Sequence, residues 1–236
     1  MMRRILYTLV LALIASTLTH AQCNAYFAYQ EGDVFEQTTY DAKGKEQDRQ
    51  TMKIMEVIDG IDMTTYKVNA SSSMSKKGES YDLEFTCEDG VFRFDGQKLL
   101  ESVIKQMQAE GMEVTMEGET SSYPADMSVG DQLNETSFTM TMSGNMEGMS
   151  MDVVTTIAIS DRKVVESASI TTDAGTFDCL KINYTMTSTS EVMGMTQSSI
   201  TSGVEYVAKR VGVVRSETFD NKGKLITRNE LTKTSL

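Results

Sequence analysis

A chain of 236 residues with a net charge of −12 has no concentration of Lys and Arg that could neutralise phosphates, which argues against a nucleic-acid partner. Its one histidine, His20, lies near the N-terminus, so most hydrolase and metalloenzyme mechanisms lack their usual base or ligand. Tryptophan is absent and aromatic residues make up only 7%, which disfavours a sugar-stacking cleft. Composition therefore predicts a protein that is not an enzyme and needs no cofactor.

Residues 1–21 have the pattern of a secretory signal peptide, with a basic start, a short apolar run and a small-x-Ala end. The apolar run is too short to span a bilayer as a helix. Gln22 stands directly before Cys23, where lipoprotein signals need a small residue, so we expect no lipid anchor. We expect cleavage after Ala21 and a single soluble domain over residues 22–236, located in the periplasm or secreted.

Most of the remaining sequence alternates between apolar and polar residues with a period of two, which is typical of strands with one buried face. Short turn signals containing glycine cut the chain at hairpin spacing. They lie at residues 41–45, 59–60, 76–79, 88–90, 173–175 and 220–224. The pattern predicts a mainly β protein built from antiparallel hairpins.

One segment departs from this pattern. Between residues 98 and 109, apolar residues recur at spacings of three and four, and Gly111 follows directly. This predicts an amphipathic helix, which in an antiparallel protein packs most simply against the concave side of a curved sheet. A mobile lid over a cavity is the alternative role for the same helix. The following stretch, residues 120–133, contains the only proline, Pro124, and is predicted to be a loop.

Methionine is unusually abundant, with 18 residues in the chain. Phe138, Met140 and Met142 alternate with threonines, which predicts that they point inward, where a thioether fills irregular apolar space. A second group is harder to interpret as core because it surrounds a predicted hairpin tip. It consists of Met146, Met149 and Met151. Thioethers bind Cu(I), so a metal site at this tip is the alternative to a core or apolar pocket.

Three cysteines in an oxidising compartment predict one disulfide and one spare thiol. Cys87 alternates in phase with apolar residues, whereas Cys179 alternates in phase with Lys181 and Asn183. Because one thiol then points inward and the other outward, we expect Cys23, on the terminal segment, to pair with Cys179. Three unpaired cysteines in a reducing compartment are the alternative.

Several short stretches, in this order, make the chain similar to the TapB-like group of exported bacterial proteins, which is related in style to exported domains with a LolA-like half-barrel. The stretches are residues 23–27 with 31–32, 40–45, 87–92, 174–179, 206–214 and 219–225. The resemblance covers the chain after the signal peptide. It implies a curved antiparallel sheet around an apolar concavity, and it brings no established activity and no catalytic residues.

Pattern and resemblance together predict a curved antiparallel half-barrel with one amphipathic helix on its concave side. By fold-level analogy, we expect a non-enzymatic envelope protein that binds a lipid or other apolar ligand, or a partner protein, in this concavity. A Met-rich Cu(I)-binding exported protein is the first alternative, and an envelope assembly or surface protein without a small ligand is the second. The expected ligand-binding residues, which would serve equally well as plain core, are Leu83, Phe85, Leu99, Ile104, Met107, Phe138, Met140 and Met142.

Overall fold

The structure is a computed structural model that describes residues 23–74, 80–94, 104, 112–118, 121–146, 149–192 and 194–235. The predicted signal peptide lies outside the described residues. So does the helix predicted at residues 98–109, with the exception of Ile104, which has helical backbone conformation and a half-buried side chain. Among the described residues no helix runs along the sheet, so the predicted helix on the concave side has no support from the structure.

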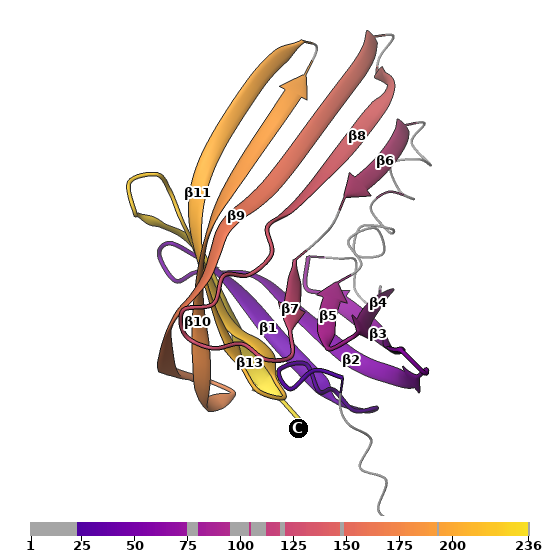
Figure 1. Cartoon of the computed structure of the whole chain (residues 1–236). Coiled ribbons are helices and arrows are strands. Elements are labelled where there is room, and N and C mark those ends of the chain that lie inside the picture. The colour runs from indigo at the N-terminus through magenta and orange to yellow at the C-terminus, as the bar shows by residue number, and fades with distance from the viewer. Residues whose placement is uncertain are drawn as a thin grey trace, which may run out of the picture.

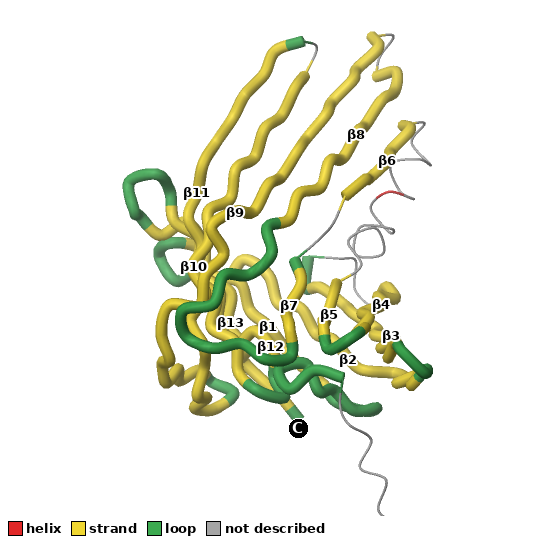
Figure 2. The backbone as a smooth tube through the Cα atoms, viewed as in Figure 1, coloured by secondary structure: helices red, strands yellow, loops and turns green. Residues whose placement is uncertain are grey.

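Within the described residues, thirteen antiparallel strands form one large open sheet (Figures 1 and 2). The strands are β1 (Val34–Asp41), β2 (Glu46–Asp59), β3 (Met63–Ser72), β4 (Tyr81–Glu88), β5 (Val91–Phe94), β6 (Met112–Gly118), β7 (Ser122–Pro124), β8 (Thr136–Met146), β9 (Met149–Thr172), β10 (Gly175–Val192), β11 (Met195–Ala208), β12 (Gly212–Phe219) and β13 (Leu225–Thr234). Their order across the sheet is β6-β8-β9-β10-β11-β12-β13-β1-β2-β3-β4-β5-β7. The prediction of a mainly β, antiparallel protein is confirmed.

Two hairpin turns at opposite ends of the sequence share the same side-chain chemistry. In the β1–β2 turn, one carboxylate oxygen of Asp41 accepts hydrogen bonds from the backbone amides of Lys43 and Lys45, at 2.8 and 2.9 Å. Asp220 binds the amides two and four residues further on in the same way in the β12–β13 turn, at 2.9 Å each. In both turns the glycine has a positive φ, which explains the recurring Asp-x-Lys-Gly-Lys sequence.

The first part of the N-terminal segment, residues 23–29, packs into the core of the lower half of the molecule as it is drawn in Figure 1. The Asn24 side chain is fully buried, and its amide group donates to the carbonyls of Gly90 and Tyr123 at 2.9 Å each. The ring of Phe27 stacks on that of Phe92, with centroids 4.2 Å apart. The buried Asn24 amide has its hydrogen bonds satisfied, and the stacked rings hold the segment at a second point. The segment therefore forms part of the core.

The short strand β7 lies inside the stretch that was predicted to be a loop. It pairs with β5 at the end of the sheet, and Pro124 is its last residue, where a missing amide donor costs least. Arg162 of β9 donates from Nη1 to the carbonyls of Ser122, at 3.0 Å, and Asn134, at 3.1 Å. These contacts join β7, at one end of the strand order, to β9, which is third from the other end.

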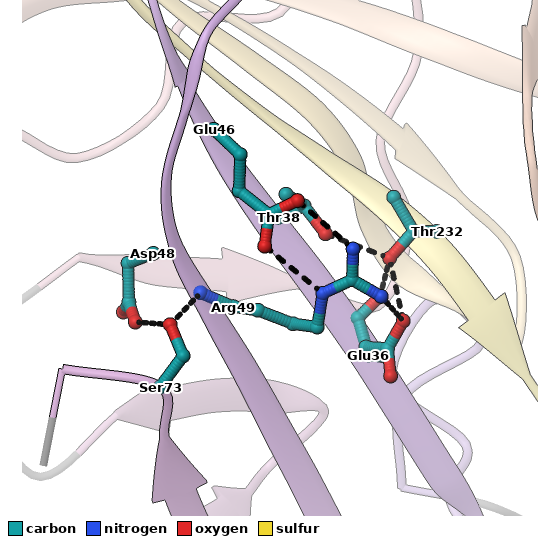
Figure 3. A network of polar contacts seen from close by, with 7 residues as sticks. All are labelled: Glu36, Thr38, Glu46, Asp48, Arg49, Ser73 and Thr232. Carbon is teal, nitrogen blue, oxygen red and sulfur yellow. Dashed lines mark hydrogen bonds and ion pairs between the residues drawn. The ribbon is translucent and has the colours of Figure 1, made fainter.

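A polar network on β1, β2 and β13 ties the C-terminal strand to the N-terminal ones (Figure 3). Arg49 forms ion pairs with Glu36, at 3.1 Å, and with Glu46, at 2.9 Å, while the hydroxyl of Thr232 donates to Glu36 at 3.1 Å. The arginine side chain is largely exposed and its partners are already occupied. Exposed pairs of this type contribute little stability, and this network offers no open binding group.

Candidate functional site

The upper parts of β6, β8, β9 and β10 carry an apolar face on one side, and the ladder register fixes which residues belong to it. Met116 lies opposite Met140, and Phe138 lies opposite Ile157. We define the apolar face by its nine apolar side chains. They are Val114, Met116, Phe138, Met140, Met142, Val153, Ile157, Ile159 and Met186. Thr155 of β9 and Ser188 and Ser190 of β10 lie on the same side, and the hydroxyls of Thr155 and Ser190 are 3.1 Å apart. The predicted shared orientation of Phe138, Met140 and Met142 is confirmed.

The opposite side of the same strands consists mainly of threonine and serine. The hydroxyls of Thr139 and Thr156 lie 2.9 Å apart across β8 and β9, and those of Thr189 and Ser198 lie 3.3 Å apart across β10 and β11. A face of hydroxyl groups that hydrogen-bond one another and can bind water is suited to solvent. Along β6 and β8 one side is therefore apolar and the other polar, whereas β10 carries hydroxyl groups on both sides.

The apolar face continues the core-facing side of the sheet. The register between β10 and β11 is uninterrupted from Cys179 to Val192, so Ile182, Tyr184 and Met186 lie on the same side of β10. Ile182 is completely buried in the core of the lower half, whereas Met186 is only half-buried. Apolar surface thus extends from the closed core into the upper wall of the sheet, which rises above the rest of the molecule in Figure 1.

Burial across the apolar face is uneven. Val114 and Met116, on the edge strand β6, are only 5% and 8% exposed. The members of the face on β8, β9 and β10 are half-buried and keep part of their surface open. Contiguous open apolar surface is uncommon in a protein that works alone in water, and it commonly marks a binding surface.

A buried polar cluster lies where the apolar face meets the lower core. The Tyr123 hydroxyl donates to Oε2 of Glu205 at 2.9 Å, and the guanidinium carbon of Arg162 lies 5.2 Å from the centre of the Tyr123 ring. The ring of Tyr184 covers Gly203, where any side chain would overlap it. Arg162 is only 2% exposed, yet its Nη2 makes no hydrogen bond with the part of the chain that the structure describes.

Electrostatics in this cluster follow from burial. Desolvation raises the pKa of Glu205, and the opposing effects of Arg162 and of the hydrogen bond from Tyr123 are smaller. Burial likewise raises the pKa of Tyr123 and of Tyr184, and in both cases the nearby Glu205 carboxylate adds to the shift. Two tyrosines that stay protonated and an arginine that joins β7 to β9 indicate a structural role for the cluster.

The five other predicted ligand-binding residues do not belong to the apolar face as we define it. Leu83 and Phe85 are 3% exposed and belong to the closed core of the lower half, so they line no open surface. Leu99 and Met107 lie outside the described residues. Ile104 is described and is half-buried.

The alternative metal site is only partly described. At the end of the β8–β9 hairpin, the backbone of Met146 pairs with that of Met149, and Gly144 pairs with Met151. The structure describes the backbone of these three methionines but not their side chains. In the residues that the structure covers, no group of three or more His, Cys, Asp or Glu side chains could hold a metal ion. The copper alternative therefore stays a prediction.

The predicted disulfide is wrong, because Cys23 pairs with Cys87 and not with Cys179. The two bonded cysteines have Cα atoms 6.0 Å apart. Cys87 does point inward with its apolar neighbours, as predicted. Cys23 was expected to pair with the outward-facing thiol, but the N-terminal segment enters the core, where its cysteine meets the inward-facing Cys87.

Cys179 is a free, buried thiol. It shares its side of β10 with Lys181, as predicted, but that side is not open to solvent at this point. Arg215 of β12 reaches across it and donates to the carbonyl of Thr171, near the end of the β9–β10 hairpin. The alternation of residues correctly predicted on which side of β10 Cys179 lies. That side is buried because the β9–β10 hairpin curls toward β12.

Sequence reasoning did not find Arg162, Tyr123, Glu205 or Asn24. Arg162 follows Asp161, which has a positive φ at a break in the β9–β10 register, so simple alternation fails there. Glu205 and Tyr123 come from strands at distant positions in the sheet. No local pattern marks such a long-range pair.

Comparison with known proteins provides the family. The model of the DUF3108-like family matches residues 30–231, which is most of the chain. The chain belongs to the DUF3108-like family. No functionally curated protein matches it.

Two solved structures have the same fold as this DUF3108-like chain. One is a protein from Bacteroides fragilis named as exported and as having a YmcC-like fold, with 23% identity and a TM-score of 0.67, covering 91% of this chain and 100% of its own. The other is a protein from Parabacteroides distasonis named as a lipoprotein, with 23% identity and a TM-score of 0.66, covering 90% of this chain and 99% of its own. Within the described part of this DUF3108-like chain, no helix is long and apolar enough to cross a membrane.

Proposed function

We propose that this protein is a non-enzymatic envelope protein that binds an apolar ligand, such as the acyl chain of a lipid, on the apolar face. The observation that carries the proposal is that one side of β6, β8 and β9, joined by Met186 of β10, is mainly apolar and partly open, while the other side carries mainly hydroxyl groups. If the sheet only needed a core, its upper part would need no exposed apolar side. Methionines suit such a surface because a flexible thioether adapts to ligands of different shape.

We further propose that the protein acts in the periplasm or after secretion, with residues 1–21 removed as a signal peptide. The names of its two structural neighbours, one exported and one a lipoprotein, support an envelope location. The narrower TapB-like assignment and the half-barrel description rest on the quoted sequence stretches and belong to the same proposal.

Fluorescence titration with N-phenyl-1-naphthylamine, an apolar dye, tests ligand binding on this face. We expect the mature protein to bind the dye, and Met140→Asp to weaken binding by at least about tenfold, because the substitution places a charge among apolar side chains. Thr141→Asp introduces the same charge on the opposite face of the same strand and is the matched control. Met140→Leu, which conserves volume, should bind like the parent.

Each outcome of this titration has a meaning. Circular dichroism confirms that both aspartate variants are folded, and Ile157→Asp repeats the test on β9 if Met140→Asp is not. Equal loss in Met140→Asp and Thr141→Asp, or no dye binding by the parent, contradicts the proposal. Stoichiometric Cu(I) uptake that disappears when Met146, Met149 and Met151 are all changed to leucine would favour the metal alternative. A parent that takes up neither dye nor copper would favour the assembly or surface role.

A further inference from the structure

A groove at the β2–β3 end of the sheet lies apart from the apolar face. Three segments form it: the N-terminal residues 23–31, the β2–β3 hairpin and the turn between β4 and β5. Its volume is about 620 Å³, which is in the range of sites that hold a ligand or a short peptide segment. In Figure 1 the β2–β3 hairpin is at the lower right, far from the tops of β8–β11.

The charges in this groove have one sign. It is lined by the carboxylates of Glu31, Asp59, Asp62 and Asp89, and by no lysine or arginine. None of the four forms an ion pair with any residue in the described part of the chain. Asp59 accepts one hydrogen bond, from the hydroxyl of Thr64 at 3.0 Å. The groove therefore concentrates negative potential that a basic group could complement.

The same groove exposes apolar side chains. Ile61, at the hairpin tip, is fully exposed, and Met63 beside it is 45% exposed. Val57, Tyr29 and Tyr66 form the inner wall. An isolated exposed isoleucine needs no explanation, but here exposed apolar side chains adjoin a groove of uniform charge.

The walls of the groove are held in place before any ligand binds. The Cys23–Cys87 disulfide lies in the lining and ties the N-terminal segment to β4. The hairpin tip is closed by a hydrogen bond of 2.8 Å from the amide of Gly60 to the carbonyl of Met63. A preformed groove loses less conformational entropy when it binds a partner.

We propose that this groove binds an extended segment of a partner protein in which basic side chains alternate with apolar ones. The lysine or arginine groups would pair with the four carboxylates, and the apolar groups would pack on Ile61, Met63 and Val57. A membrane surface fits less well, since the carboxylates repel anionic lipid headgroups. This site is separate from the apolar face and does not depend on the function proposed for that face.

Fluorescence anisotropy with a labelled peptide of four Lys-Leu repeats tests the groove on the mature protein. We expect binding, with peptides of Glu-Leu and Lys-Ser repeats binding at least about tenfold more weakly because each lacks one of the two features. Changing Asp59 and Asp62 together to asparagine should weaken Lys-Leu binding about fivefold, as expected for the loss of two exposed ion pairs. Asparagine keeps an acceptor for Thr64, so the hairpin should stay intact.

The matched control changes the exposed Glu113 and Glu117 of β6 to glutamine, which removes the same charge elsewhere and should leave Lys-Leu binding unchanged. Ile61→Ser should weaken binding without any change in charge, and Met140→Asp should not affect it. Equal losses in the two double variants would mean that net charge alone attracts the peptide, which overturns the proposal. Binding to phosphatidylglycerol vesicles but not to the peptide, with loss in Ile61→Ser, would indicate a membrane surface and also overturn it.

Discussion

The sulfur of Cys23 can carry either a lipid or a disulfide bond, but not both. A lipoprotein would carry its lipid on this atom as a thioether, whereas in the structure the atom is bonded to the sulfur of Cys87. One structural neighbour is named as a lipoprotein. The absence of a lipid anchor, expected from Gln22, stays a prediction.

The pairing makes a prediction about both thiols and stability. Peptide mapping without reduction should join Cys23 to Cys87, and Cys179 should resist alkylation at pH 8 until the protein unfolds, because burial raises its pKa to about 11. The bond spans 64 positions of sequence, so Cys87→Ser should lower the free energy of unfolding by about 3–4 kcal/mol. Recovery of a Cys23–Cys179 peptide, or an intact mass that includes acyl chains, would contradict the structure.

Glu205 predicts a pH dependence whose sign follows from its burial. Its raised pKa means that the folded protein binds the proton more tightly than the unfolded chain does. The contribution of Glu205 to stability is therefore most favourable below the ordinary pKa of 4.5 and declines as the pH rises through the raised value. Glu205→Gln cannot ionise, so its stability relative to the parent should increase between pH 4 and pH 7.

Urea unfolding at several pH values measures this difference. Glu191→Gln is the control, because it makes the same substitution at an exposed position on β10. A relative stability of Glu205→Gln that falls as the pH rises would show that Arg162 outweighs desolvation at this site.

At the scale of single elements, β10 and β11 approach each other closely at one point. Gly203 lies opposite Tyr184, and a Cβ atom there would overlap the tyrosine ring. Gly203→Ala should therefore lower the free energy of unfolding by about 1–3 kcal/mol, as overpacking does in closed cores. Thermal unfolding measures the loss, and the exposed Ser202→Ala is the control. Adding Tyr184→Leu to Gly203→Ala should remove the overlap, so the second change should cost less in the Gly203→Ala background than alone.

The strands show which features the sequence could predict. Alternation correctly placed Phe138, Met140 and Met142 on one face, because β8 has a regular register with both neighbours. The same alternation does not predict the positive φ of Asp161, which shifts the register of β9 and turns Arg162 into the core. A bulge depends on the partner strand as much as on its own sequence.

At the scale of the whole molecule, the arrangement depends on contacts between distant parts of the chain. Asn24 joins the N-terminus to the β4–β5 turn and to β7, and Tyr123 joins β7 to Glu205 of β11. These contacts close the lower half and leave the apolar face of β6, β8, β9 and β10 partly open. Sequence patterns predicted that sheet and its turns, but not which distant residues close it, since such pairs leave no periodic signal.

We propose that the molecule as a whole holds an apolar ligand on its apolar face in the envelope. Native mass spectrometry of the mature protein purified from its own host tests this most directly, because it distinguishes bound lipid, bound copper and no ligand in one spectrum. We expect a fraction of the parent to carry an adduct with the mass of a lipid, Thr141→Asp to keep this adduct and Met140→Asp to lose it. A parent that carries only copper, or no adduct under conditions that preserve a known lipid complex, would contradict the claim.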